Sequence, residues 1–200
     1  MSKIGILGGT FDPVHLGHTE LAASAAAELE LDKIYLMPAN TQPFKIGRRT
    51  ASPEDRLEML KLAASDYPNM EVLDYELKKE GISYTYETIS ELRSIYEGDE
   101  FCFIVGSDSL LKIDSWYKGD ELLRICSLAV GLRDNSIRST IKEKATYLSE
   151  KFGADITLID KLIIPVSSTD IRERIENGMS VSGLISPEVE DYIYEKRLYL

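Results

Sequence analysis

The sequence predicts an α/β fold in which helices cover both faces of a parallel sheet. The main observation is an alternation along the whole chain, in which short β-branched or aromatic runs are separated by longer segments of helical periodicity. Such an alternation favours a parallel sheet flanked by helices. The chain has 200 residues and no repeat, low-complexity segment or long linker. We therefore expect one domain over residues 1–200, to which the C-terminal helical segment from about 166 to 200 belongs.

Six runs predict strands, and stripes of apolar residues predict helices between them. The expected strands are Lys3–Leu7, Lys33–Met37, Met70–Asp74, Phe101–Val105, Leu128–Leu132, and a sixth at either Ile156–Ile159 or Leu162–Pro165. The stripes comprise Leu21, Ala22, Ala25 and Leu29 on one helix, Leu57, Leu60 and Ala64 on a second, and Tyr86, Ile89, Leu92 and Tyr96 on a third. Ser52 before Pro53 and Ser186 before Pro187 are typical of helix starts, because the hydroxyl caps the helix and proline suits its first turn.

The composition limits the classes of function. A formal net charge of −11 disfavours general affinity for nucleic acid or for anionic membranes. No apolar run reaches about 18 residues, and no apolar stretch with a small-residue cleavage site follows the first methionine, so we expect neither a membrane span nor a secretory signal. Cys102 and Cys126 lie in apolar runs and are expected to be buried thiols. These features indicate a reducing, cytoplasmic location.

The loop after the first strand carries the strongest chemical signal. In parallel α/β sheets, ligands bind beyond the carboxyl ends of the strands. This loop reads GGTFDPVHLGH, in which two glycines allow close approach to the backbone and Thr10 adds a hydroxyl. His15 and His18, the two histidines of the chain, flank Gly17 at the start of the next helix, and Gly17 leaves room for a bulky group. The N–H groups and the dipole of that helix favour an anion, so we expect a phosphate site, with helix capping and half of a metal site as alternatives.

GGTFDPVHLGH resembles the T/HxGH nucleotidyltransferase motif, in the form found in bacterial nicotinate-nucleotide adenylyltransferases. Phosphopantetheine and nicotinamide-nucleotide adenylyltransferases share parts of it. The resemblance covers nearly the whole chain and implies a Rossmann-like nucleotidyltransferase fold. It also implies catalytic roles for His15 and His18. ATP binding is implied for Gly8, Gly9, Thr10, Phe11 and Gly17.

The loop after the second strand and the helix start that follows also match this family. Residues 38–45 read PANTQPFK, which keeps the family's lysine as Lys45 and has Phe44 where a histidine is usual. The resemblance implies that Lys45 contacts phosphate and acts in catalysis. Arg56, in SPEDRLEML, is left open between a surface charge and a partner for a neighbouring carboxylate.

Residues 165–178, PVSSTDIRERIENG, resemble the family's SSTxIR helix start. The resemblance implies ATP binding by Ser167, Ser168 and Thr169. It implies a catalytic role for Arg172, since a guanidinium one turn into a capped helix can bind polyphosphate. Capping alone would also account for Ser168 and Thr169.

Two further segments carry the resemblance for the second substrate. ISYTYETI is similar to the family's SYT segment and implies that Thr85 binds the pyridine substituent, with a helix cap by Ser83 or Thr85 as the alternative. In FIVGSDSLLKIDSWYKGDELL, the resemblance implies that Trp116 stacks on a nicotinate ring that Tyr117 helps to frame; core packing is the alternative for Trp116. Other positions also match: the resemblance implies ATP contacts by Gly106 and Asp108, and a substrate contact by Arg133.

Together these motifs predict transfer of AMP from ATP to nicotinate mononucleotide, giving nicotinate adenine dinucleotide and pyrophosphate in NAD biosynthesis. Mg²⁺ is expected to arrive with ATP, with no dedicated metal site. Three alternatives remain: nicotinamide mononucleotide or phosphopantetheine as the acceptor, or a nucleotide-binding sensor without turnover. Three departures from the family pattern keep the sensor open: Phe44 and Glu87, which replace a usual histidine and aspartate, and the altered segment after Arg133. The sequence leaves the oligomeric state open, a homo-oligomer included.

Overall fold

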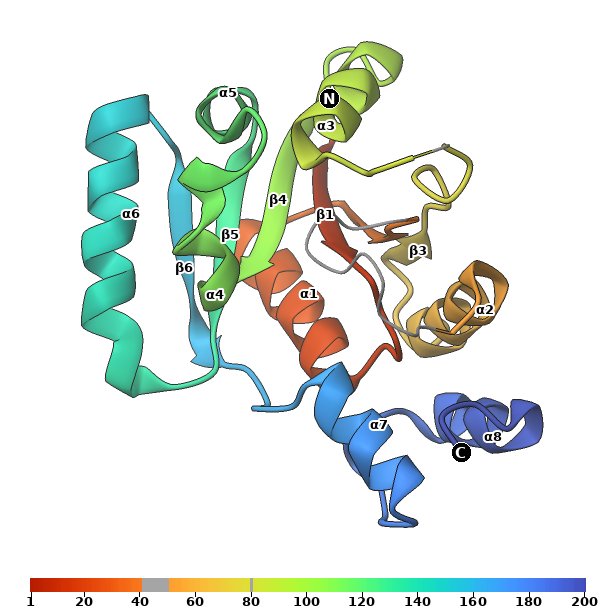
Figure 1. The fold of residues 1–200 in the computed structure, drawn as a ribbon. Coiled ribbons are helices and arrows are strands. Elements are labelled where there is room, and N and C mark those ends of the chain that lie inside the picture. The colour runs from red at the N-terminus through yellow and green to blue at the C-terminus, as the bar shows by residue number, and fades with distance from the viewer. Residues whose placement is uncertain (41–50, 80) are drawn as a thin grey trace.

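A six-stranded parallel sheet forms the centre of the protein (Figure 1). The computed structural model describes residues 1–40, 51–79 and 81–200. The strands are β1 Lys3–Gly9, β2 Lys33–Pro38, β3 Met70–Val72, β4 Glu100–Gly106, β5 Ser127–Leu132 and β6 Ile156–Leu162. Their order is β3-β2-β1-β4-β5-β6, and every neighbouring pair is parallel. The predicted parallel sheet is confirmed, although β3 ends two residues earlier than expected.

The sixth strand follows the first of the two predicted alternatives, and it extends to Leu162 instead of ending at Ile159. Its pairing with β5 contains an irregularity between Val130 and Leu132. The second alternative, from Leu162 to Pro165, lies mostly in the connection that leads from β6 to the next helix.

Helices connect the strands and follow the sheet at its end. They are α1 Leu16–Leu29, α2 Pro53–Ala64, α3 Thr85–Ile95, α4 Ser107–Leu110, α5 Gly119–Ile125, α6 Arg138–Phe152, α7 Ser168–Glu176 and α8 Pro187–Lys196, with 3-10 turns at Ile113–Ser115 and Asn135–Ile137. The two predicted serine–proline starts are confirmed. The Ser52 hydroxyl accepts a hydrogen bond from Asp55 N, and the Ser186 hydroxyl accepts one from Val189 N.

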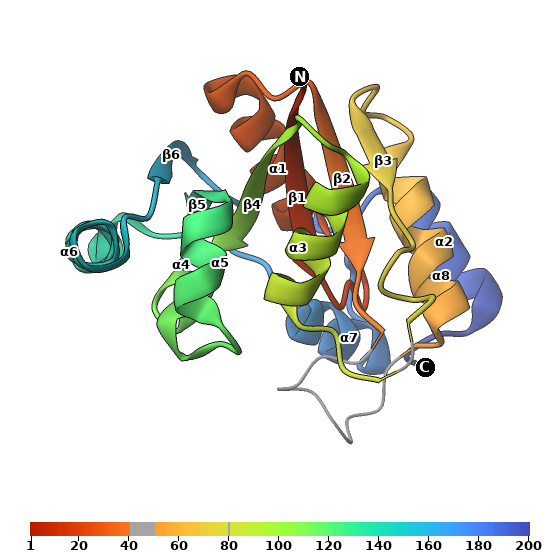
Figure 2. The ribbon, with the colours of Figure 1, turned by 90° about the horizontal axis from the view of Figure 1, so that it is seen from above.

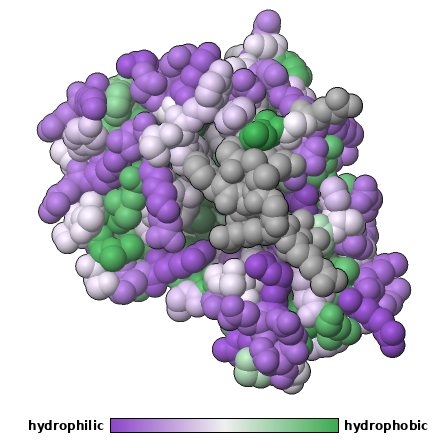
Figure 3. Space-filling view, in the orientation of Figure 1, coloured by the Kyte–Doolittle hydropathy of each residue, from purple (hydrophilic) through white to green (hydrophobic). Residues whose placement is uncertain are grey.

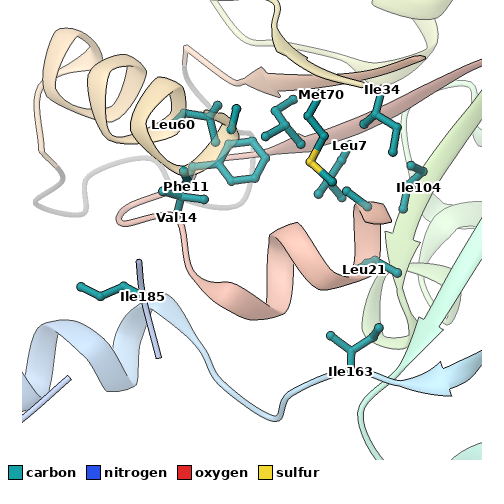
Figure 4. Packing of buried hydrophobic residues seen from close by; sticks show 14 of the residues in the cluster. Leu7, Phe11, Val14, Leu21, Ile34, Leu60, Met70, Ile104, Ile163 and Ile185 are labelled. Atoms are coloured by element: carbon teal, nitrogen blue, oxygen red, sulfur yellow. The ribbon is translucent and has the colours of Figure 1, made fainter. Parts of the chain in front are cut away.

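Alternating strand residues supply two hydrophobic clusters, one on each face of the sheet. On one face, Leu7 and Ile104 pack with residues of α1, α2, α7 and α8 (Figure 4). On the other, Ile6 and Phe103 pack with residues of α3, α4, α5 and α6. Figure 2 shows α3 and α5 side by side over this second face. The C-terminal helices therefore share a core with the N-terminal strand.

The surface carries scattered hydrophobic residues. On the face seen in Figure 3, most side chains are hydrophilic and the hydrophobic ones form small, separate patches. Cys102 and Cys126 are buried and unpaired, as predicted, and burial raises their pKa values to about 11 and about 12. In the part of the chain that the structure describes, no helix has the length and apolar character needed to cross a membrane.

Candidate active site

A cavity of about 400 Å³ opens at the carboxyl ends of the central strands. Its floor includes the ends of β1 and β4, where the connections from adjacent strands leave towards opposite faces of the sheet. Such a switch point is where open α/β sheets bind ligands. Ten of the predicted site residues that the structure describes line this cavity: Gly8, Gly9, Gly17, His18, Thr85, Gly106, Asp108, Trp116, Tyr117 and Arg133.

The loop after β1 is anchored by a side chain that turns inward. Phe11 has a φ of 50° in the left-handed region, which costs on the order of 1–2 kcal/mol for a residue with a side chain. Its ring is buried beside Leu60 of α2 (Figure 4) and lies against Gly9, where an added Cβ would come within 3.1 Å of the ring. The predicted ATP contact of Phe11 therefore does not use its ring, which serves to fix the loop.

The two histidines start α1 and stack on each other. His15 is the N-cap residue, and the ring centroids of His15 and His18 lie 3.5 Å apart with an interplanar angle of 16°. The backbone N–H of His15 donates to His18 Nδ1 at 3.2 Å, and the Phe11 ring meets the His18 ring edge-on at 4.9 Å. Because Nδ1 accepts a hydrogen bond, the proton of the neutral His18 ring is on Nε2. The His18 side chain therefore caps the start of α1 and also lines the cavity, so the capping alternative and the predicted site are compatible.

His15 lies deeper than His18 and does not line the cavity. Burial, and after it the nearby charge of Arg133, lower the pKa of His15 from 6.5 to about 3. His15 is therefore neutral at pH 7. Desolvation of the buried ring outweighs the opposing attraction of the Asp170 carboxylate.

Arg56 is a buried residue that ties the first two loops together, so both readings offered for it from sequence are wrong. It is 2% exposed, and its Nη1 donates to the carbonyl oxygens of Thr10 and Ala39, each at 2.8 Å. Burial lowers its pKa, and the charge of Asp12 opposes this effect. The guanidinium thus links the segments that follow β1 and β2 by donating to one carbonyl oxygen of each.

Gly17 serves close packing. A Cβ at this position would lie 3.1 Å from the Ile164 carbonyl oxygen and 3.2 Å from His15 Nδ1. The space predicted beside Gly17 for a bulky group is therefore partly taken by the segment that leads into α7. Gly17 still lines the cavity through its backbone.

The predicted residues at the start of α7 do not line the cavity. They contact the loop of residues 8–18 after β1, which we call the histidine loop. Ser167, and neither Ser168 nor Thr169, is the N-cap, and its hydroxyl accepts from Asp170 N at 3.1 Å. Ser168 instead donates from its hydroxyl to the Pro13 carbonyl oxygen at 2.9 Å. Arg172 Nη1 donates to the Asp12 carbonyl oxygen at 2.6 Å. The structure thus brings α7 onto the histidine loop.

The opposite wall of the cavity is aromatic. Trp116 lies edge-on to the buried Phe103 ring, with centroids 6.3 Å apart, and Tyr117 packs against Tyr84 with centroids 4.6 Å apart. Thr85 is the first residue of α3, whose N-cap Tyr84 makes no side-chain cap bond. The capping alternative for Thr85 and Ser83 is therefore wrong, and both residues line the cavity.

The ends of β4 and β5 complete the site. Apart from its two chain neighbours, no described residue has a heavy atom within 4 Å of the position that a Cβ on Gly106 would take, so this backbone is open to the cavity. Asp108, in the first turn of α4 after β4, and Arg133, directly after β5, line the cavity with exposed side chains. A carboxylate and a guanidinium there can bind hydroxyl and phosphate groups, respectively.

Two residues of the site carry no signal in the sequence. Glu76, in the segment after β3, is buried in the cavity wall, accepts a hydrogen bond from the Thr88 hydroxyl at 2.8 Å, and has its pKa raised by burial. Tyr199, near the C-terminus, donates from its hydroxyl to Asp12 Oδ1 at 2.7 Å.

Lys45 and Phe44 lie outside the described residues. Among those that are described, no group of three or more His, Cys, Asp or Glu residues could hold a metal ion.

The fold is an open α/β sheet with a cavity at its switch point, and residues 6–174 match the model of the cytidylyltransferase-like family. A probable nicotinate-nucleotide adenylyltransferase of Clostridium botulinum (strain Alaska E43 / Type E3) is 37% identical over 199 residues, which cover all of this chain and 98% of that protein. One from Carboxydothermus hydrogenoformans is 38% identical and covers 99% of this chain and 98% of its own length. The chain therefore belongs to the nicotinate-nucleotide adenylyltransferases within the cytidylyltransferase-like family.

Solved structures agree with the fold. The nicotinic acid mononucleotide adenylyltransferase of Plasmodium falciparum complexed with NaAD superposes with a TM-score of 0.80 at 21% identity, over all of this chain and 98% of that chain. The same protein complexed with APC gives a TM-score of 0.79 at 20% identity.

Proposed function

We infer that this protein transfers the adenylyl group of ATP to nicotinate mononucleotide, which yields nicotinate adenine dinucleotide and pyrophosphate for NAD biosynthesis. The observation that carries the inference is one cavity that joins two kinds of wall. His18 and the glycines of the β1 loop form one side, and Thr85, Trp116 and Tyr117 form the other. A nucleoside triphosphate on the first wall and a pyridine ring on the second would meet at the strand ends.

The reaction needs no protein nucleophile. A phosphate oxygen of the mononucleotide attacks the α-phosphorus of ATP in line, a new P–O bond forms, and the bond to the β-phosphate oxygen breaks so that pyrophosphate leaves. Catalysis then depends on orientation and on stabilising charge at the phosphoryl oxygens. His18 Nε2 is the donor that we assign to these oxygens, and Lys45 and Arg172 are the cations.

His15 holds the His18 ring in place. Its backbone N–H holds His18 Nδ1, and its ring stacks on the His18 ring. Two stacked rings cannot both take a proton without strong repulsion, so we assign a neutral state to His15 and a positioning role to its ring. The anionic charge of the substrates is then balanced by arginine and lysine side chains.

The aromatic wall accounts for the acceptor. Trp116 would stack on the pyridine ring, Tyr117 would frame it, and the backbone or hydroxyl of Thr85 would bind the ring substituent. Arg133 would contact substrate phosphate from the end of β5, and Asp108 would accept hydrogen bonds from ribose hydroxyls. The helix start at Ser167, Ser168 and Thr169 would contact the polyphosphate once Arg172 binds it.

Mg²⁺ bound to ATP would neutralise part of the polyphosphate charge. We expect phosphate oxygens and water to hold this ion, without a dedicated site on the protein. We place the reaction in a reducing, cytoplasmic compartment, because both thiols are buried and unpaired.

A pyrophosphate-release assay tests this function. The protein is incubated with ATP and Mg²⁺ and with nicotinate mononucleotide, nicotinamide mononucleotide, phosphopantetheine or no acceptor. We expect the fastest release with nicotinate mononucleotide and none without an acceptor. Fastest release with another acceptor would reassign the substrate, and ATP binding without any release would identify a sensor.

A further inference from the structure

Asp12 is a buried carboxylate at the base of the histidine loop. It is 3% exposed, and its Oδ1 accepts hydrogen bonds from Ala51 N at 2.9 Å and from the Tyr199 hydroxyl at 2.7 Å. Arg172 Nη1 lies 3.6 Å from its Oδ2 and binds its backbone carbonyl oxygen. A buried carboxylate requires donors of this kind. Four segments of the chain therefore meet at one side chain.

Tyr199 reaches Asp12 from the second-to-last position of the chain, 187 residues away in sequence. Its φ of 64° lies in the left-handed region, which is unfavourable for a residue with a side chain, and its ring packs against the hydrophobic cluster of α1, α2, α7 and α8. Burial and the charge of Asp12 raise the pKa of Tyr199, so the hydroxyl stays protonated and remains a donor at any assay pH.

Arg172 is shared between Asp12 and the solvent side of the loop. Its Nη2 contacts the Thr169 hydroxyl at 3.3 Å, and 29% of its side chain is exposed. Without the Tyr199 hydroxyl, Asp12 would lose one of the donors on Oδ1. Among the described donors that contact Asp12, Arg172 Nη1 is the one with room to move closer, since it lies 3.6 Å from Oδ2. A guanidinium drawn fully onto Asp12 would be less free to bind a phosphate.

We propose that Tyr199 is a positioning residue of the ATP site, which satisfies Asp12 so that Arg172 remains able to bind the polyphosphate. The proposal rests on the proposed function. If Tyr199 has this role, the loss of its hydroxyl should weaken ATP binding selectively and leave the binding of the acceptor nucleotide unchanged. A purely structural role would not produce this selectivity.

Tyr199→Phe tests the proposal, with Tyr192→Phe as the matched control. Tyr192, in α8, also donates its hydroxyl to a carboxylate, Asp55 Oδ1 at 3.0 Å, but Asp55 lies at the start of α2, where its other oxygen accepts from the Ser52 hydroxyl. We expect Tyr199→Phe to raise the KM for ATP by about tenfold, the order expected for losing one charge-assisted hydrogen bond. The KM for nicotinate mononucleotide should change by less than about twofold, as should all constants of the control.

Asp12→Asn separates the indirect effect from a general weakening of the fold. If Tyr199 acts through Asp12, adding Tyr199→Phe to Asp12→Asn should not raise the KM for ATP further. Additive effects would overturn the proposal, as would an unchanged KM for ATP in Tyr199→Phe or equal changes in both KM values.

Calorimetric titration with ATP and Mg²⁺ in the absence of an acceptor gives a second readout. A wild-type protein that releases no pyrophosphate would contradict the proposed function. The comparison of ATP dissociation constants between Tyr199→Phe and Tyr192→Phe would still decide the role of Tyr199: a selective loss in Tyr199→Phe supports it, and equal constants overturn it.

Discussion

The two walls of the cavity are built in different ways. On the histidine side, polar groups are buried and fixed by hydrogen bonds to the main chain, as in Arg56 to Thr10 O and His15 N to His18 Nδ1. On the aromatic side, Trp116 and Tyr117 are partly exposed and are held by contacts between rings. A fixed array of donors suits stabilisation of a transition state, whereas rings with few fixed contacts suit binding of a flat ligand. The first wall should therefore control turnover, and the second should control acceptor affinity.

The largest expected effect is that of His18→Ala on turnover. Loss of one well-placed donor to a phosphoryl oxygen typically costs on the order of 10²–10³ in rate. We expect kcat to fall by this factor while the far-ultraviolet circular dichroism spectrum stays unchanged, because His18 lines the cavity and lies outside the two hydrophobic clusters. Steady-state kinetics at saturating ATP measures the change. Wild-type turnover in this variant would remove His18 from the mechanism.

Arg56→Met should show that the histidine wall depends on buried hydrogen bonds for stability. The substitution removes the donors that Arg56 gives to two carbonyl oxygens, so we expect the free energy of unfolding to fall by about 2–3 kcal/mol. Urea denaturation measures this value. Arg174→Met is the matched control, since Arg174 also donates to a backbone carbonyl, Ser180 O at 3.3 Å, but on the surface. Equal effects in the two variants would contradict the assignment.

Trp116→Ala should affect the other wall. Stacking of an aromatic side chain on a base-like ring contributes about 1–3 kcal/mol, so the KM for nicotinate mononucleotide should rise by about tenfold. The KM for ATP should stay near its wild-type value. Tyr147→Ala, which removes an exposed aromatic ring from α6, serves as the control. A fall in kcat without a rise in KM would show that the two walls do not divide their roles as proposed.

The comparison also explains what could be predicted from the sequence. The strands, the histidine loop and the aromatic wall were predictable because each is encoded in a short segment, such as GGTFDPVHLGH or DSWYKGD. The apolar runs alone do not determine the strand order, because it depends on which runs become neighbours in the sheet. The Rossmann-like fold that the resemblance implies does have the observed order, β3-β2-β1-β4-β5-β6.

Contacts between distant segments escaped prediction for the same reason. Nothing near Arg56 in sequence indicates that it binds the carbonyl oxygen of Thr10, which is 46 residues away. The interaction of Tyr199 with Asp12 is equally invisible before the chain folds. The cap of α7 illustrates a finer limit, because three successive hydroxyl residues can all cap a helix and only the backbone conformation selects Ser167.

The smallest expected effect concerns the buried ring of His15 and the pH dependence of stability. The unfolded chain takes up a proton on this histidine near pH 6.5, whereas the folded protein does so only near pH 3. Unfolding therefore binds a proton between these values, so the stabilising contribution of the neutral ring is complete above pH 6.5 and declines as the pH falls. Between pH 6.5 and 5.5, the wild type should lose about 1 kcal/mol of unfolding free energy that His15→Gln does not lose. Urea denaturation of both proteins at the two pH values measures the difference, and the other titrating groups cancel because the variants share them. Equal losses would mean that His15 is hydrated enough to take up a proton in the folded protein, and the histidine wall would then resemble the aromatic wall in its openness to solvent.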